Sequence, residues 1–275
     1  SEKLSTIVEK FNRYGIKDIE LSYGVYEKNF ENNFRKFYKN NNFILHNYFP
    51  KPEKDFVINL ASFDKKIRLR SIEFIKKNID FSAKYKLKYY SFHAGFLIDP
   101  KPKSLGKVIP KVFVQPRKKS TEIFISSIIK LARYAKKKKI KLFLENNVIS
   151  KANLKRFEKN PLLMTEPKEI KRIMCQLPEN VKLLMDVAHF KVSSKTLKFN
   201  LVKSFKELKE FTGAYHLSDN NGVIDNNKDI KKKSWFMNLI SLVDFISIEV
   251  ANKNLNQIRD QLGLIKKRIS YLNAE

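Results

Sequence analysis

The stretch that decides the fold is residues 120–147, "STEIFISSIIKLARYAKKKKIKLFLENN", where a helix pattern runs directly into a strand pattern. Apolar residues between Ile125 and Ala132 recur at the i, i+3, i+4, i+7 spacing that places them on one helix face. The apolar run that follows is typical of a buried strand, and it ends in the polar Glu145. This unit predicts a helix, a short turn and a strand with a polar group at its end.

The same unit recurs along the chain. A capping box, Thr6-x-x-Glu9, predicts the start of the first helix, which Gly15 closes. Helix patterns also cover residues 67–85, residues 165–174 with a Thr cap and an early Pro, and the segment carrying Leu255, Ile258 and Leu262. Strands are expected near residues 18–22, 43–49, 89–95, 140–147, 182–189, 214–220 and 246–250.

The alternation of strands and helices determines the fold class. Parallel strands joined by helices need right-handed crossovers, and seven of them in one chain of this length favour a closed arrangement over an open sheet. No Gly-rich phosphate loop follows the first strand, which also argues against a doubly wound sheet. We therefore expect an α/β fold, a TIM (β/α)-barrel formed by residues 1–275 as one domain. Helix signals begin at residue 6, so the usual opening strand is expected to be missing or replaced.

Charge and composition limit location and partners. The chain has 56 basic and 28 acidic residues, a formal charge of +28, and such a field attracts polyanions. The excess is mostly Lys spread over helices, so we expect a solvated basic surface, with a nucleic-acid footprint as the alternative. The sequence lacks an apolar run of about 18 residues and a signal-peptide pattern, which indicates a cytoplasmic protein without a membrane partner. A single cysteine, Cys175, excludes an internal disulfide framework.

A long basic segment, residues 99–118, interrupts one of the repeated units. Long loops in compact domains are often lids or binding loops, although an inert excursion is the alternative. Its Lys103, Lys107 and Arg117 could each neutralise a phosphate, which would suit a phosphorylated sugar as substrate. Solvated surface is the alternative for these cations.

Residues with catalytic or metal-binding chemistry stand at the ends of the predicted strands. They are His46, His93, Glu145, Asp186, His189, His216, Asp219 and Glu249. All four histidines of the chain are among them. A lone His on an apolar strand is usually a hydrogen-bonded core residue, but that explanation would have to apply separately at each strand end. Because a parallel barrel brings the carboxyl ends of its strands to one mouth, the pattern predicts one shared site.

The carboxylates of this set predict a bound cation. Buried carboxylates are costly unless they are paired or bound to a cation. A mixed shell of His and carboxylate ligands suits Mn²⁺, Zn²⁺, Fe²⁺ or Co²⁺ better than Ca²⁺. The Asp186-x-x-His189 spacing is weak evidence alone, and it becomes stronger beside Glu145, His216 and Glu249.

At these residues the chain resembles the xylose isomerase-like TIM-barrel superfamily, which contains sugar isomerases, sugar epimerases and the endonuclease IV family. The resemblance runs from "GIKDIELS" (15–22) to "ISIEV" (246–250) and rests on "FILHNYF", "FHAG", "LEN", the Asp-x-x-His, "HLSD" and the final Glu. It implies a metal-dependent isomerase or epimerase that acts on a small-molecule sugar or sugar phosphate. A homodimer is one assembly that the resemblance allows. The superfamily's opening strand precedes the first helix, so the chain departs from the pattern there.

Similarity to the ketose epimerases implies the roles of individual residues. The metal ligands would be Glu145, Asp186, His216 and Glu249, holding one divalent ion, Mn²⁺ first, with Zn²⁺, Co²⁺ or Mg²⁺ as alternatives. Glu145 and Glu249 would also be the catalytic acid and base on opposite faces of the sugar. A metal that polarises the substrate oxygens stabilises the enediolate formed when a proton next to the carbonyl leaves. Substrate contacts are expected from His46, His93, His189, Asp219 and Asp225.

Similarity to endonuclease IV implies a different function, metal-dependent cleavage at apurinic sites in nucleic acid. "DFVINLAS" (55–62) and "FHAG" support it, and it would place His46, His93 and Glu145 around one zinc ion and Asp186, His216 and Glu249 around a second. A third zinc would need His189 and an Asp-x-His pair, where this chain has Asp225-Asn226-Asn227. An amide oxygen is a poor zinc ligand beside imidazole. Asn227 therefore favours sugar chemistry over the nuclease.

Overall fold

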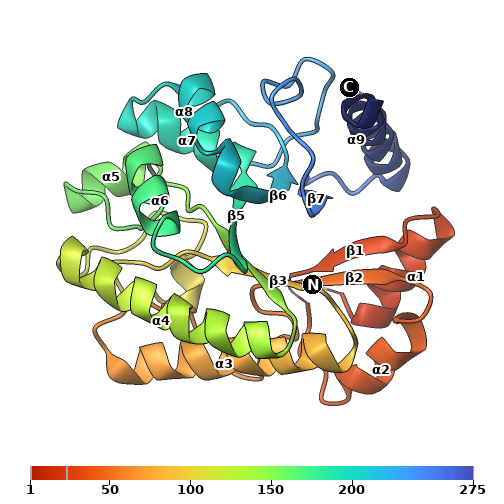
Figure 1. Ribbon diagram of the computed structural model, residues 1–275, viewed down its shortest axis with the longest axis horizontal. Coiled ribbons are helices and arrows are strands. Elements are labelled where there is room, and N and C mark those ends of the chain that lie inside the picture. Colours follow the sequence, from red (N-terminus) through yellow and green to blue (C-terminus); the bar gives the residue numbers. More distant parts are fainter. Residues whose placement is uncertain (1, 23, 275) are drawn as a thin grey trace.

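The computed structural model describes residues 2–22 and 24–274. Across these residues seven parallel strands form a nearly closed barrel with the helices outside it (Figure 1). The strands are β1 (Asp18–Leu21), β2 (Asn42–His46), β3 (Tyr89–His93), β4 (Lys141–Glu145), β5 (Val181–Asp186), β6 (Thr212–Leu217) and β7 (Phe245–Ile248). The predicted α/β TIM barrel is confirmed.

The helices cover the outer face of the barrel (Figure 1). They are α1 (Leu4–Arg13), α2 (Phe30–Phe37), α3 (Lys65–Lys84), α4 (Arg117–Lys137), α5 (Lys151–Phe157), α6 (Pro167–Met174), α7 (Val187–Leu197), α8 (Leu201–Glu207) and α9 (Leu255–Ala274), with short 3₁₀ turns η1 (Pro102–Ser104) and η2 (Lys209–Phe211). Those from α2 to α8 connect the strands from β1 to β6 in turn, α1 precedes β1, α9 follows β7, and residues 218–244 join β6 to β7 without a helix. None of the helices within the described ranges is long and apolar enough to span a membrane.

Two predicted helix starts are wrong. The first helix begins at Leu4, so Thr6 lies inside it; the free N–H of Leu4 donates instead to Glu27 Oε1 at 2.8 Å. The fourth predicted helix has Glu166, not Thr165, at its N-cap, followed by Pro167. In both cases a tertiary contact or a proline fixes the helix start, and a local side-chain cap is not needed.

One predicted strand runs too far. We expected a strand near 182–189, but β5 ends at Asp186 and α7 begins at the next residue. The side chain of Asp186 accepts the backbone N–H of His189 at 2.7 Å, which caps the new helix. His189 therefore lies in the first turn of a helix above the strand end.

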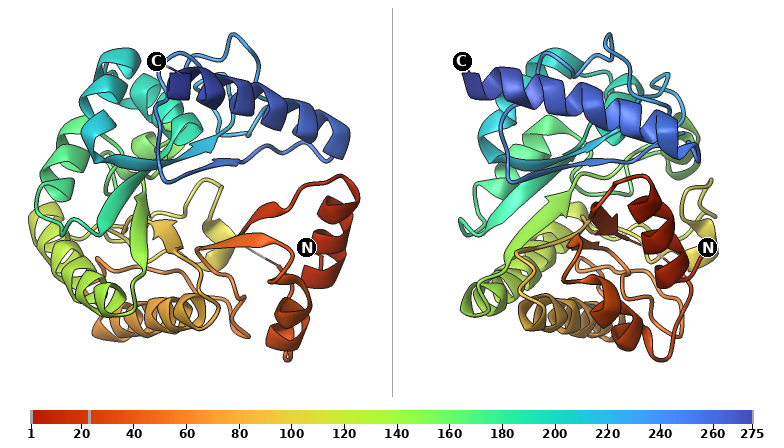
Figure 2. Two further views of the ribbon diagram at one scale, coloured as in Figure 1. Left: turned by 45° about the vertical axis from the view of Figure 1, so that its right-hand side comes forward. Right: turned by 90° about the vertical axis from the view of Figure 1, so that its right-hand side faces the viewer.

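The barrel has an open seam. Each strand pairs only with its sequence neighbours, in the order β1 to β7, and within the described ranges β1 and β7 do not pair with each other. Figure 2 shows β1 and β2 on one side of this seam and β7 with α9 on the other. In residues 2–22 the first element is α1, and β1 follows it, so the described part of the chain contributes seven strands to the barrel.

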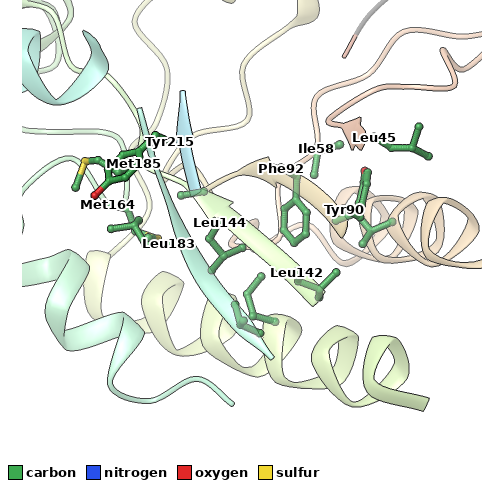
Figure 3. Packing of buried hydrophobic residues seen from close by; sticks show 14 of the residues in the cluster. Leu45, Ile58, Tyr90, Phe92, Leu142, Leu144, Met164, Leu183, Met185 and Tyr215 are labelled. Carbon is green, nitrogen blue, oxygen red and sulfur yellow. The ribbon is translucent and has the colours of Figure 1, made fainter. Parts of the chain in front are cut away.

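Alternating side chains divide the strands between two faces. In β4, Leu142 and Leu144 belong to the main core between sheet and helices, where they pack with Tyr90 and Leu183 (Figure 3). Phe143 lies on the opposite face, in a separate cluster with residues of β5 and β6. Because side chains alternate along a strand, Glu145 shares the inner face with Phe143. The last inward position of the strand is thus a carboxylate at the barrel mouth.

The basic segment 99–118 is tied to the barrel at its base. Asp99 accepts hydrogen bonds from Asn59, Ser62 and Gln115. Arg117 begins α4 and donates to Glu169 Oε1 at 2.5 Å and to the carbonyls of residues 160 and 162. Since Arg117 already has these partners, its expected contact with a phosphate has no support in the structure.

Candidate metal centre and active site

Strand register brings the predicted site residues together. In the β3–β4 pair His93 lies beside Glu145, and in the β5–β6 pair Asp186 lies beside His216. His216 in turn lies beside Ser247 of β7, two residues before Glu249. Because the strands are parallel and nearly in register, side chains far apart in sequence form one layer at their carboxyl ends.

Glu145 lies at the centre of this layer, 1% exposed, with all four histidines around it. Its Oε2 is 3.2 Å from His46 Nε2 and 3.2 Å from His93 Nδ1. Its Oε1 is 3.3 Å from His189 Nδ1 and 3.6 Å from His216 Nδ1. The strand-end histidines are therefore not separate core residues, since they share one carboxylate.

His189 lies on one side of Glu145, between several acceptors. Its Nδ1 is 2.9 Å from the carbonyl of Asn146, and its Nε2 is 3.1 Å from Asp225 Oδ2. Burial alone would lower the pKa of His189, but the charges of Asp186 and Asp225 outweigh it and raise that pKa well above its ordinary value. An imidazolium here can donate a proton or a hydrogen bond toward the barrel mouth.

His216 lies on the other side, between Glu249 and a residue that the sequence pattern did not predict. Its Nδ1 is 3.0 Å from Glu249 Oε2, and its Nε2 is 2.9 Å from Glu20 Oε2. Burial opposes the charged form of His216, but Glu20 and Glu145 outweigh it and raise its pKa well above the usual range. Glu249 is 46% exposed, so one of the two predicted catalytic carboxylates faces the solvent side of the site.

Burial separates the pKa values of neighbouring groups. It raises the pKa of Asp186 to about 8, against the opposing effect of His189, and lowers the pKa of His93 to about 4. Burial would also raise the pKa of Glu145, but the nearby His93 and His216 lower it well below its ordinary value. Strongly perturbed groups gathered at a strand-end mouth are typical of a functional site.

The site residues fit a divalent cation. Ligand atoms of Glu145, Asp186, His216 and Glu249 all lie within 4.8 Å of one another. Among the described residues, His93 Nδ1, Glu145 Oε2 and His216 Nδ1 are buried without a hydrogen-bond partner. Buried polar atoms without partners are costly, and a cation in this group would satisfy those of Glu145 and His216. His46, His93 and Glu145 form a second group of ligand distance, and Glu20, His46 and His216 form a third.

A cleft of about 1080 Å³ reaches this layer from the side. It lies along the open seam between β1 and β7, and its lining includes Glu20, His46, His216 and Glu249. The walls toward α1 and α9 are apolar. The seam therefore leaves the side of the site near Glu20 accessible from the cleft. If β1 and β7 were paired, they would cover that side.

Asp219 and Asn227 are used by the loop after β6. Asp219 pairs with Lys191 Nζ at 2.6 Å and bridges the backbone of Lys228, so its expected contact with substrate stays a prediction. Asn227 Oδ1 accepts from Ser218 Oγ at 3.3 Å. Asp225, by contrast, reaches the site through its contact with His189.

Glu20 and Ser91 belong to the site but were not predicted. Both lie within a strand, on the inward face below the terminal ligands, whereas the sequence pattern concerned strand ends alone. The acidic residue inside the apolar run "IKDIELS" was the available signal, since Glu is depleted in strands.

A sequence model of the family described as xylose isomerase-like TIM barrel matches residues 8–268. The chain belongs to this family. No curated protein matches the sequence.

Solved structures with the same fold share little sequence with the chain. A D-tagatose 3-epimerase-like protein superposes with a TM-score of 0.73 at 17% identity, covering 99% of this chain and 96% of that one. An L-ribulose 3-epimerase gives 0.64 at 14% identity, covering 96% and 82%. A xylose isomerase-like TIM-barrel protein from Mycobacterium smegmatis, in complex with magnesium, gives 0.68 at 10% identity, covering 98% and 89%. At these identities the similarity shows the fold alone.

Proposed function

We propose that the protein is a metal-dependent sugar isomerase or epimerase that moves a proton next to a carbonyl. The observation that carries the proposal is the pairing of Glu145 and Glu249, whose carboxylates meet within 4.8 Å beside Asp186 and His216. A divalent cation held by these four residues would place positive charge beside the substrate carbonyl and make the neighbouring C–H bond more acidic.

The two carboxylates are suited to transfer the proton. Glu249 is 46% exposed and lies 3.0 Å from His216 Nδ1, so its carboxylate is placed to accept a proton from a sugar in the mouth. Glu145 is buried among histidines that hold it in the charged form, with a pKa well below the ordinary value. Two carboxylates that lie on different strands can remove a proton on one face of a planar carbon and return it on the other.

The remaining side chains of the mouth can bind sugar hydroxyl groups. His189 carries a proton because of Asp186 and Asp225, so it is a donor. His93, whose side chain is 34% exposed, is neutral because burial lowers its pKa to about 4, so it can accept as well as donate. A polyhydroxylated substrate would use both kinds of contact.

The structural neighbours support the same reaction class. They include a D-tagatose 3-epimerase-like protein, an L-ribulose 3-epimerase and a 3-keto-D-glucoside 4-epimerase, and one neighbour is in complex with magnesium. Another, a protein from Thermus thermophilus, was soaked with zinc chloride. We propose Mn²⁺ as the working ion, with Zn²⁺, Co²⁺ or Mg²⁺ as substitutes, and a small sugar or sugar phosphate as the substrate.

A second candidate, an endonuclease IV-like phosphoesterase, is favoured by one observation. His46, His93 and Glu145 form a further group of ligand distance, so Glu145 could be shared by two ions. A net charge of +28 would suit a nucleic-acid substrate. The neutral amide of Asn227, which contacts Ser218, weakens a third zinc site.

The proposal is tested by metal analysis and isotope exchange. Protein freed of metal with EDTA is reloaded with Mn²⁺ and incubated in D₂O with a panel of ketopentoses and ketohexoses. We expect one ion per chain and one solvent deuteron in the product at the epimerised carbon, detected by NMR. The EDTA-treated protein without added metal is the control.

Two outcomes would contradict the proposal. Three zinc ions per chain together with cleavage of a duplex that contains an abasic site would support the nuclease. Product formed without solvent deuterium would exclude proton exchange as the route.

A further inference from the structure

Glu20 occupies a position below the metal layer that its neighbours leave without another explanation. It lies in β1, the edge strand of the seam, and its side chain is only 10% exposed although no Lys or Arg pairs with it within the described ranges. Burying a carboxylate without a cationic side chain is costly. Its contacts must therefore offset that cost.

Those contacts are two histidines of the site. Glu20 Oε2 lies 2.9 Å from His216 Nε2, which is hydrogen-bond distance. Glu20 Oε1 accepts from Ser91 Oγ at 3.1 Å, and Ser91 Oγ is 2.8 Å from His46 Nδ1. Glu20 Oε1 also lies 3.6 Å from His46 Nδ1, so Glu20 contacts both histidines and is further linked to His46 through the Ser91 hydroxyl group.

Each of these histidines turns its other nitrogen upward. His216 Nδ1 faces Glu249 and Glu145, and His46 Nε2 faces Glu145. A metal-ligating imidazole must present an unprotonated nitrogen to the ion, and a carboxylate that accepts the N–H on the far side fixes that tautomer and the ring orientation. Glu20 stands on the far side of both rings.

We propose that Glu20 is a positioning residue that holds the rings of His216 and His46 from below, so that His216 presents Nδ1 to the metal layer while His46 keeps Nε2 beside Glu145 and the Asn47 amide. This inference rests on the proposed metal-dependent function. It assigns Glu20 a hydrogen-bonding role beneath the site, and Glu20 itself does not touch the ion or the substrate.

Three variants test the inference. Glu20→Gln keeps the size of the side chain but removes its charge, and Ser91→Ala removes the hydroxyl group between Glu20 and His46 while leaving the contact of Glu20 with His216. Asp18→Asn is the matched control, because Asp18 lies two residues earlier on the same face of β1, and within the described ranges its side chain bonds to Asn42 and to none of the site residues. Thermal denaturation of each variant shows that it is folded.

The first measurement is Mn²⁺ affinity by isothermal titration calorimetry. Loss of an orienting carboxylate behind a ligating histidine typically costs about 10- to 100-fold in metal affinity. We expect a loss of this size for Glu20→Gln and none for Asp18→Asn, with one ion bound throughout. Ser91→Ala should stay near wild type, because His46 is not among the four proposed ligands. Affinity within about twofold of wild type for Glu20→Gln would overturn the inference, as would a lower number of bound ions, which would make Glu20 a ligand.

The second measurement needs no metal. In the metal-free protein, ¹⁵N-histidine NMR should show that the ring-nitrogen signals of His216 and His46 move in Glu20→Gln and stay as in wild type in Asp18→Asn, because the hydrogen-bond acceptor beneath both rings has changed. Unchanged ring-nitrogen signals in Glu20→Gln would overturn the inference. If wild type binds no Mn²⁺, the proposed function fails, and this measurement still decides the role of Glu20.

Discussion

Replacing Glu249 by Gln should abolish proton transfer while leaving the fold intact. The amide keeps the size of the side chain but cannot act as a base, and a general base typically contributes about 10²- to 10⁴-fold to the rate. That range corresponds to about 3–5 kcal/mol of activation free energy. Glu249 Oε2 lies 3.0 Å from His216, but the side chain is 46% exposed. Because the Glu249 side chain is this exposed, solvent screening limits what its contact with His216 adds to stability to about 1 kcal/mol or less.

The assay is kcat/KM for ketose epimerisation at saturating Mn²⁺, with deuterium uptake from D₂O measured in parallel. Glu210→Gln is the control, because Glu210 lies in η2, before the amino end of β6 and so at the opposite end of the barrel. We expect Glu210→Gln to match wild type in both measurements. Wild-type turnover or wild-type deuterium uptake in Glu249→Gln, with metal bound, would refute Glu249 as the base.

Three further predictions concern stability. Arg117→Ala should lower the free energy of unfolding by about 3 kcal/mol in urea titrations, because it leaves the carboxylate of Glu169, 3% exposed, with only the more distant Arg172, at 3.8 Å, as a cationic partner. The pKa of Glu20 is lowered from 4.5 to about 2, so its contribution is present above pH 4.5 and lost as the pH falls toward 2; urea titrations of metal-free wild type and Glu20→Gln should show their difference shrinking over that interval. Gly263→Ala meets open space inside α9 and should raise stability by about 0.5–1 kcal/mol in thermal melts, whereas Gly213→Ala, whose Cβ would lie 2.7 Å from Lys182 Cβ, should lower it.

The fold could be predicted because its signals are local. Helical periodicity ahead of each apolar run is set by residues within about 20 positions, so the seven strands and their parallel arrangement follow from the sequence. Strand ends were harder to predict. The strand predicted near residues 182–189 placed both Asp186 and His189 in extended backbone. In the structure the strand ends at Asp186, whose side chain caps the helix that carries His189.

The site could be predicted to the extent that it lies at strand ends. Glu145, Asp186, His216 and Glu249 meet because parallel register carries strand ends to one layer, and that rule needs no knowledge of side-chain packing. Glu20 could not be found in this way. Its role depends on which nitrogen of His216 faces downward, a matter of ring orientation within the folded barrel.

Asn227 shows why a residue type alone does not settle the choice between the two functions. The sequence shows only that an amide stands where a zinc ligand would be needed. In the structure Asn227 has a φ of 43°, a left-handed conformation that Asn tolerates, and its carbonyl accepts the N–H of Ala251 at 2.7 Å. That bond holds the backbone two residues after Glu249. Asn227 therefore fixes the segment that carries the proposed base, so replacing it with a histidine would disturb that segment as well as supply an imidazole.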